Sequence, residues 1–559
     1  MTGRGGGWLR LAPPVTLALM LGPVLAGLAG TLAPALMQDA RGFATLADWP
    51  GLAGAVWLSL TTGIGSTVLG LAATLLLVAG LHGTRIFAAL TRAISPLLAV
   101  PHAAAALGIA FLIAPSGWIA RALSPWATGW DSPPDLLILN GPAGVALTLG
   151  LVAKEVPFLL LMTLAALPQT DARRRLMLTA SLGYGRIAGF AFAVLPALYR
   201  QIRLPVYAVL AYAMTAVEMA MILGPTRPPT LSVQIVLWMS HPDLAYRATA
   251  SAGAVLQLGL VVAALLGWRG AEMLAARALR ALAGAGRRGR GLDGTLRPVA
   301  GGLAVGLVAV LAAGLAGLAV WSVAGLWQFP DALPETLSLA TWTRAAPGLA
   351  QAAAVSAGLA LAATVVALAL VLACLEAEAR HGLRPGSRAL WLLYLPLIVP
   401  QVAFLPGLQL MALLTGAEGT GLAVAAAHLV FVLPYVFLSL ASPFRAWDGR
   451  IAVAAQALGA GPGRIFWRLR LPMLLRPVLT AAAVGVAVSV GQYLPTLMIG
   501  GGRVVSLTTE AVALSSGGNR RVVGAYAILQ MALPALAFGL ALALPALVYR
   551  HRRGMAVAA

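Results

Sequence analysis

The sequence predicts an all-α polytopic membrane protein with about twelve transmembrane helices, arranged as two homologous six-helix halves. Three observations support this fold class: the composition, the number of long apolar segments, and one polar motif that occurs twice. Of the 559 residues, 60% are hydrophobic and only 10% are charged, whereas a soluble domain carries about 25% charged residues. A protein core cannot absorb this much apolar surface, so lipid must solvate much of the chain.

Apolar segments long enough to cross a hydrocarbon layer of about 30 Å form two sets of six. The first set comprises residues 15–37, 53–80, 94–114, 143–168, 204–224 and 249–268. The second set comprises residues 299–325, 348–374, 389–414, 421–441, 476–499 and 525–549. The first segment follows basic residues, so it is either a cleaved signal peptide or a retained span, and its length favours a retained span.

A basic, glycine-rich stretch, RALRALAGAGRRGRGLDGTLRP, separates the two sets. This composition is typical of a linker at a membrane surface. We therefore expect a first six-helix half at residues 1–276, a basic cytoplasmic linker at 277–298, and a second six-helix half at 299–559.

The distribution of arginine predicts the orientation in the membrane. With the N-terminus inside and the spans alternating, 29 arginines face the cytoplasm and 8 face the outside. The positive-inside rule favours this topology, which places both termini in the cytoplasm. The net charge of +21 would suggest nucleic acid in a soluble protein, but these cytoplasmic arginines account for it. We expect a lipid bilayer and no nucleic acid as partner.

One polar segment occurs in both halves at a spacing of 276 residues. Segments 182–200 and 458–476 share eight of nineteen residues, where the biased composition alone would give about two. The shared residues are Leu182, Gly183, Gly185, Phe190, Leu195, Pro196, Leu198 and Arg200, which match Leu458, Gly459, Gly461, Phe466, Leu471, Pro472, Leu474 and Arg476. Each copy lies between the fourth and fifth span of its half, so a tandem duplication of a six-span unit explains the spacing.

The residues of this motif predict a helix–turn–helix. A short helix is expected to end at the shared leucine, where the following glycine supplies a tight turn. An amphipathic helix follows, with Phe190 or Phe466 toward the core, and Pro196 or Pro472 begins the next span. Such a loop can be anchored to anionic lipid by arginine, or it can receive force from another protein. Two matched copies favour a pair of docking points for a two-fold symmetric partner.

The motif resembles the cytoplasmic loop of ABC importer permeases, in which EAA and three further residues precede a glycine and a Leu-Pro pair follows. Both copies have the family's thirteen-residue step from glycine to proline, and the shared phenylalanine occupies its aromatic position. The family's glutamate is replaced by Met177 and Val453, and its two alanines remain only in the second copy. The residues implied to form ATPase-coupling loops are Ala180, Ser181, Leu182, Gly183, Tyr184, Gly185, Phe190, Pro196, Ala454, Ala455, Gln456, Ala457, Leu458, Gly459, Ala460, Gly461, Phe466 and Pro472.

The resemblance spans nearly the whole chain and implies a type I ABC importer permease (MetI-like) with both halves fused. It is similar to the ferric-iron and thiamine group, and LAVPHAAAALGIAFLIAPSGW and KEVPFLLLMTLAALPQ look closest to a thiamine-like branch. It implies an ATP-binding cassette ATPase homodimer on the cytoplasmic side, a periplasmic solute-binding protein outside, and a bacterial inner membrane. The implied function is to move a small solute, such as a thiamine-like compound or ferric iron, into the cytoplasm.

The single lysine excludes ATP hydrolysis by this chain through a P-loop. That loop needs a lysine in GxxxxGK[ST], and Lys154 lies in LVAKEVPF. The chain is therefore expected to be no enzyme and to need a separate ATPase. We expect no cofactor and no metal, because Cys374, His102 and His428 lack metal-ligand spacing. A lone histidine within a span is more typical of helix packing.

Polar residues within the predicted spans are candidates for function, because ionisable groups in lipid are expensive. Glu218 lies in the middle of the fifth predicted span, and the matching span of the second half holds Gln492. With their neighbours Tyr212 and Tyr493, these residues either line the translocation pathway or join helices by hydrogen bonds. The adjacent residues Lys154 and Glu155 point about 100° apart on a helix and do not simply pair with each other. One of them can pair with a group on another helix, and we expect a structural role.

Two other function classes remain open. An ion-coupled secondary transporter also shows six-plus-six duplication, but it would carry coupling carboxylates in several spans, whereas Glu218 is the clear mid-span acid here. A membrane enzyme or assembly scaffold would show polar residues clustered at one membrane face. The sequence does not identify the solute.

Overall fold

The computed structural model describes residues 7–37, 41–383 and 386–550. These residues are predominantly helical and, within the described ranges, form no β-strand beyond an isolated bridge between Ala324 and Leu337. Ten of the described helices are long and apolar enough to cross a membrane, and two bent helix pairs raise the number to twelve. The predicted all-α polytopic membrane fold is confirmed.

Each predicted span corresponds to one helix or to a helix pair. The first set lies in α1 (Ala12–Met37), α3 (Leu52–Leu81), α4 (Arg85–Leu98) with α5 (His102–Ile113), α7 (Val145–Ala166), α10 (Leu195–Thr215) with α11 (Glu218–Leu223), and α13 (Tyr246–Gly284). The second set lies in α14 (Arg290–Val323), α15 (Ala340–His381), α16 (Ser387–Ile398) with α17 (Gln401–Leu414), α18 (Gly421–Arg445), α22 (Leu475–Val490) with α23 (Leu494–Gly500), and α25 (Arg520–Val548).

The third and fifth spans of both sets are broken rather than continuous. The sequence predicted uninterrupted segments at 94–114, 204–224, 389–414 and 476–499, and that part of the prediction is wrong. Hydropathy alone cannot detect these breaks, because the residues on both sides of each break are apolar. The breaks recur at matching places in the two sets.

Short helices connect the spans. They are α2 (Arg41–Ala47), α6 (Trp118–Leu123), α8 (Ala172–Ser181), α9 (Arg186–Gly189), α12 (Leu231–Met239), α19 (Gly449–Ala457), α20 (Pro462–Ile465), α21 (Leu471–Met473) and α24 (Leu507–Ser515). The stretch 277–298, expected to be a linker, is mostly helical. Helix α13 runs to Gly284 and α14 begins at Arg290, so only five residues separate two long helices.

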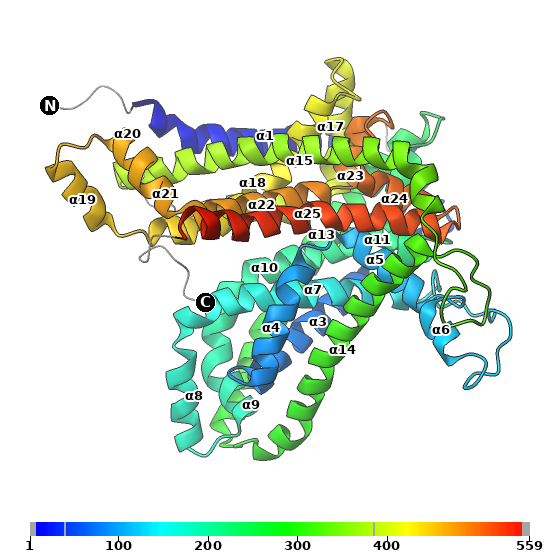
Figure 1. Cartoon of the computed structure of the whole chain (residues 1–559), viewed down its shortest axis with the longest axis horizontal. Helices are drawn as coiled ribbons and strands as arrows, with labels where there is room; N and C mark the ends of the chain where they lie inside the picture. Colours follow the sequence, from blue (N-terminus) through cyan, green and yellow to red (C-terminus); the bar gives the residue numbers. More distant parts are fainter. Residues whose placement is uncertain (1–6, 38–40, 384–385, 551–559) are drawn as a thin grey trace.

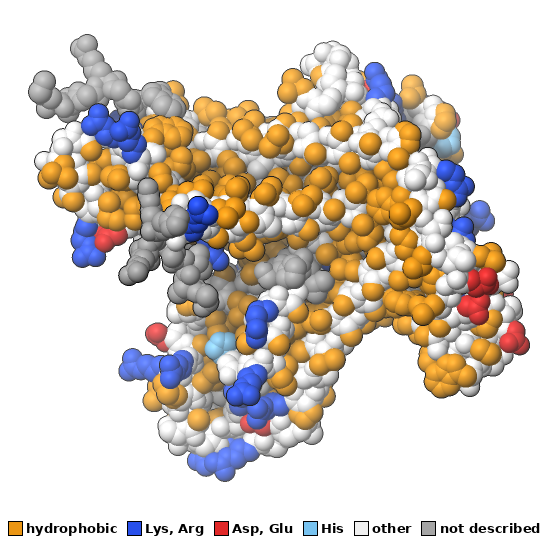
Figure 2. All heavy atoms as spheres, in the orientation of Figure 1, with side chains coloured by type: hydrophobic (Ala, Val, Ile, Leu, Met, Phe, Trp, Pro, Cys, Tyr) orange, Lys and Arg blue, Asp and Glu red, His pale blue; other side chains and the backbone are white. Residues whose placement is uncertain are grey.

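The helices form two groups set at an angle to each other (Figure 1). Helices α15, α18, α22 and α25 run side by side in one group, and α3, α7 and α14 belong to the other. The groups meet near α6 and α24 and diverge toward the opposite end, where α8 and α9 lie on one group and α19 and α20 on the other (Figure 1). Figure 2 shows apolar side chains along the length of both groups, as expected for surfaces that face lipid.

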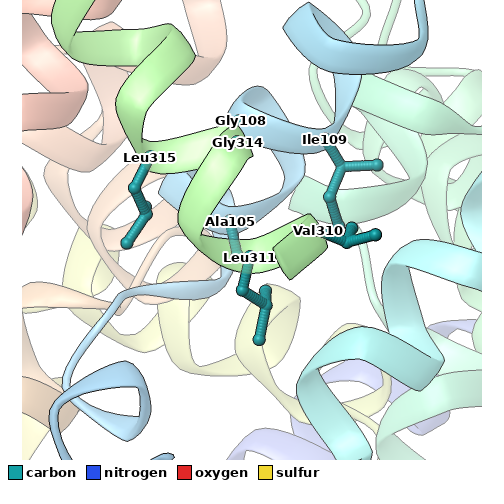
Figure 3. A pocket seen from close by; sticks show the side chains of 7 residues that line it. All are labelled: Ala105, Gly108, Ile109, Val310, Leu311, Gly314 and Leu315. Atoms are coloured by element: carbon teal, nitrogen blue, oxygen red, sulfur yellow. The ribbon is translucent and has the colours of Figure 1, made fainter. Parts of the chain in front are cut away.

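The first helix of each set packs on the other set. Helix α14 packs on α5 and α3, and α1 packs on α17 and α15. Glycines make both contacts possible. A β-carbon added to Gly108 of α5 would lie only 3.0 Å from the carbonyl carbon of Gly314 in α14, so a larger residue would push these helices apart. In Figure 3 the two helices cross at these glycines, among apolar side chains. A β-carbon on Gly407 of α17 would lie 2.0 Å from the carbonyl oxygen of Gly27 in α1. Small residues thus let the backbones approach closely.

We expect Gly407→Ala to destabilise the protein. Beyond the collision with Gly27, the amide of Gly407 donates a hydrogen bond to the hydroxyl of Thr31 at 2.8 Å, which fixes the helix spacing. Overpacking a close contact costs about 1–3 kcal/mol, so thermal unfolding in detergent should begin at a lower temperature. Gly22→Ala on α1 is the control, since no described heavy atom lies within 4 Å of its added β-carbon. Equal unfolding temperatures for both variants would contradict the close contact.

Candidate functional site

Both repeated segments form the predicted helix–turn–helix with the same backbone geometry. The glycine after the first helix has a φ of 80° at Gly183 and 81° at Gly459. This left-handed conformation suits glycine. The amide of Tyr184 donates to the carbonyl of Thr179 at 3.0 Å, and the equivalent bond in the second segment measures 2.9 Å. These bonds close a Schellman turn at the end of each helix.

The second part of each motif also repeats, with one difference. Each short helix continues into a π-helical turn that begins with the shared phenylalanine, and Phe190 and Phe466 are both buried as predicted. Pro196 lies in the first turn of α10, as predicted. Pro472 lies in the three-residue helix α21, and the chain then bends by 74° before α22. The prediction that Pro472 begins the span is therefore wrong.

The structure leaves most of the predicted loop residues accessible. The exposed ones are Ala180, Ser181, Leu182, Pro196, Ala454, Gln456, Ala457, Leu458, Gly459 and Gly461. The half-buried ones are Gly183, Tyr184, Ala455, Ala460 and Pro472, and the buried ones are Gly185, Phe190 and Phe466. The end of each first helix and its turn therefore form an accessible tip, anchored by a buried aromatic side chain.

Arginines attach the two loops to the spans in different ways. In the second loop, Arg470 forms an ion pair with Glu376 of α15 and stacks over Trp447, with its guanidinium carbon 4.4 Å from the ring centre. In the first loop, Arg186 donates to the carbonyls of Ala79, at 2.8 Å, and of His82 at the end of α3. Burial lowers the pKa of His82, and the charge of Arg186 lowers it further.

The break in the fifth span of the first set is stabilised by side chains from other helices. Helix α10 ends at Thr215, which leaves the nearby carbonyl of Met214 without a helical partner. Gln257 of α13 donates to this oxygen at 3.2 Å, and the hydroxyl of Ser232 lies 3.4 Å from it. The amide of Leu231, which begins α12, donates to the hydroxyl of Ser59 at 3.1 Å.

The same pattern occurs at the break in the fifth span of the second set. The hydroxyl of Thr508 donates to the carbonyl of Val490, and Gln530 donates to Thr508 at 2.7 Å. The amide of Leu507, which begins α24, donates to the hydroxyl of Ser356 at 2.9 Å. Met214 and Val490 are 276 residues apart, the same spacing as the two loops. The repeat thus extends from the loops to the buried hydrogen bonds.

The predicted pathway residues lie at these two breaks. Glu218 is the first residue of α11, so its predicted position within a continuous fifth span is wrong. The hydroxyl of Tyr212 donates to Glu218 at 2.8 Å. The hydroxyl of Tyr493, at the second break, lies 3.4 Å from the sulfur of Met221, which joins the two sets of spans. Gln492 also lies in the second break.

A polar cluster beside Gln492 holds the two sides of the second break. The two ring nitrogens of His428 lie 2.8 Å from the hydroxyl of Ser489 and 2.9 Å from that of Thr496. The predicted packing role of this histidine is confirmed. His102 is the first residue of α5, and its ring centre lies 4.8 Å from that of Tyr212.

The adjacent charged residues of α7 bond to two different segments of the chain. The ammonium of Lys154 donates at 2.6 Å to the carbonyl of Val100, in the break between α4 and α5. The carboxylate of Glu155 accepts from the hydroxyl of Ser66 in α3 at 3.0 Å. Across the described part of the chain, no three His, Cys, Asp or Glu side chains are placed to hold a metal ion.

Comparison with known proteins identifies the family. Residues 369–551 match the family described as binding-protein-dependent transport system inner membrane component. The chain is 31% identical over 448 residues to the inner membrane ABC transporter permease protein YnjC of Escherichia coli (strain K12), covering 79% of this chain and 78% of that protein. It is also 33% identical over 150 residues to the molybdenum transport system permease protein ModB of Mycobacterium tuberculosis, covering 25% of this chain and 54% of that protein. This chain therefore belongs to the family of ABC transporter permeases, the membrane-spanning transport subunits that are not themselves enzymes.

Proposed function

We propose that this permease is the membrane subunit of a type I ABC importer in which residues 1–276 and 299–559 form two fused halves. The observation that carries the proposal is the pair of matched helix–turn–helix loops at one end of the molecule. Each tip is accessible, and each is anchored by a buried phenylalanine to a span that leads to a helix break. Two such tips suit an ATPase homodimer, which would hold one tip on each subunit.

The arrangement of the two groups suggests how ATP drives transport. The groups diverge at the loop end and meet at the α6 end (Figure 1). At the α6 end, Arg121 donates to the carbonyl of Gln328 at 2.5 Å, and Arg520 donates to the carbonyl of Ser116 at 2.9 Å. Closure of the ATPase pair draws the loops together, and the groups then rock apart at the end that these arginines hold.

The orientation follows from the arginine distribution. The loops and both termini face the cytoplasm of a bacterium, and the chain lies in the inner membrane. The α6 end faces the periplasm, where a solute-binding protein delivers the cargo. The family description, with its reference to binding-protein-dependent transport, supports this partner.

The cargo passes between the halves near the broken fifth spans, along Tyr212, Glu218, Gln492 and Tyr493. These four polar side chains lie at the two breaks, and Tyr493 reaches across to Met221 of the other half. The cargo is a small solute, such as a thiamine-like compound or ferric iron. Because a shorter relative is named as a molybdenum permease, a transport assay should include molybdenum.

Strain in either glycine turn should weaken the contact through which the permease stimulates ATP hydrolysis by the ATPase. Gly183→Val and Gly459→Val each place a β-branched residue in the left-handed region, at a cost of about 1–2 kcal/mol or more. We expect at least a fivefold loss of solute-stimulated ATP hydrolysis in proteoliposomes that contain the ATPase and the binding protein. Gly461→Ala is the control, because Gly461 has a φ of −69° and no described heavy atom lies within 4 Å of its added β-carbon.

Normal membrane insertion with undiminished hydrolysis in both valine variants would contradict the coupling role. Solute transport by the permease alone, without an ATPase, would instead favour an ion-coupled secondary transporter.

Replacement of the Glu218 carboxyl group should slow transport without destabilising the protein. Glu218→Gln keeps the side-chain volume and an oxygen that can accept the hydrogen bond from Tyr212. We expect a tenfold or larger fall in the transport rate, with an unchanged unfolding temperature. Glu155→Gln is the matched control at a buried carboxylate in α7, and its transport should stay within twofold of wild type. A normal rate in Glu218→Gln would assign the residue to helix packing instead.

A further inference from the structure

The segment between the two halves lies against the first loop. The amide of Gly185 donates to the carbonyl of Arg288 at 2.8 Å. In the other direction, the guanidinium of Arg290 donates to the carbonyl of Gly183 at 2.8 Å. Residues 285–293 therefore bind both glycines of the turn, and we name this segment the clasp.

A carboxylate of the clasp completes the contact. The two oxygens of Asp293 accept from the amides of Arg186 and Ile187, at 2.7 and 3.0 Å. These amides begin α9 and have no partner within that helix. The fit is close as well, since a β-carbon on Gly289 would lie 2.7 Å from that of Ala188. Four hydrogen bonds and a glycine contact thus order the first turn.

The second loop has no equivalent of the clasp among the described residues. Added β-carbons on Gly459 and Gly461 would meet no described heavy atom within 4 Å. At the first turn, a β-carbon on Gly183 would lie 2.6 Å from a guanidinium nitrogen of Arg290 and 3.4 Å from one of Arg288. Two tips with the same backbone therefore present different surfaces.

The difference concerns charge as well as shape. Both tips expose a leucine, since Leu182 of the first loop is 63% exposed and Leu458 of the second loop is 89% exposed. At the first tip, the side chains of Arg287, Arg288 and Arg290 are exposed beside the turn. Figure 1 shows the beginning of α14 beside α9, and Figure 2 shows basic side chains gathered at that end of the molecule. A partner at the first tip therefore meets Leu182 together with the guanidinium groups of the clasp, whereas the exposed Arg464 of the second loop lies beyond its turn, in α20.

We propose that the clasp is part of the first docking surface, so that an ATPase subunit on the first loop also contacts Arg287 and Arg288. This inference rests on the proposed function. The chemistry requires acidic side chains on the ATPase beside the groove that receives the first tip. Since the ATPase is a homodimer, the same acidic side chains face the uncharged turn at the second tip. The turn of the first docking site is therefore more basic than that of the second, and the first site depends more strongly on salt.

The direct test reverses one charge of the clasp. Arg288→Glu changes the exposed side chain but keeps the backbone carbonyl that accepts from Gly185. In nanodiscs of zwitterionic lipid with the ATPase, we expect stimulated ATP hydrolysis to fall at least threefold. We also expect this hydrolysis to depend less on the sodium chloride concentration. Arg280→Glu is the matched control, because this exposed arginine of α13 bonds to a carbonyl of its own helix. Stimulated ATP hydrolysis with this control variant should stay within 1.5-fold of wild type.

Equal behaviour of the two charge-reversal variants overturns the inference. So does a loss that appears only when anionic lipid is added, because the arginines would then bind headgroups. If the wild type couples to the ATPase and Gly459→Val abolishes coupling while Arg288→Glu does not reduce it, the clasp proposal fails alone. If the wild type binds no ATPase, the proposed function fails.

The clasp contact can be tested without any ATPase. Asp293→Ala removes the acceptor of two amide hydrogen bonds. Hydrogen–deuterium exchange on the purified permease should show at least tenfold faster exchange in peptides that cover residues 183–187. Peptides that cover residues 459–463 serve as the internal control and should exchange as in wild type. Unchanged exchange at 183–187 overturns the clasp contact.

Discussion

The structure depends on one constraint: within the hydrocarbon layer, every backbone polar group must find its partner inside the protein. Continuous helices meet this constraint by themselves, but the broken third and fifth spans do not. The carbonyls of Met214 and Val490 instead accept from Gln257 and Thr508, and that of Val100 accepts from Lys154. Much of the buried polar chemistry of this apolar chain therefore serves its helix breaks. These side chains make irregular backbone possible within the spans.

The loops, spans and breaks form a continuous mechanical connection. In the first half, the loop leads into α10 without a large bend, and α10 ends at the break beside Glu218. In the second half, a 74° bend separates the loop from α22, while Arg470 ties it to Glu376 of α15. Helix α1 packs on α17 and α15 of the second set, and α14 packs on α5 and α3 of the first set. These contacts join the halves. Each loop is therefore linked to both groups of helices through packed helices.

Hydropathy and the repeated motif predicted the number of spans and the geometry of both turns. They failed where the structure depends on contacts between distant residues. The breaks require Ser232, Gln257 and Thr508, which lie 15 or more residues away from the carbonyls they bond and carry no local signal. The clasp was missed because the composition of 277–298 suggested a linker at the membrane surface, whereas Asp293 bonds to a loop 107 residues earlier. The crossing of α5 and α14 at Gly108 and Gly314 likewise depends on distant glycines.

The central claim is that the two tips are docking points for one ATPase pair on the cytoplasmic side. Photo-crosslinking residues placed at Leu182 and Leu458, which are 63% and 89% exposed, test it directly. In inverted membrane vesicles with added ATPase, both positions should crosslink to the ATPase, and in right-side-out vesicles neither should react with an impermeant label. Crosslinking from neither position, or labelling of either tip from the outside, would contradict the account.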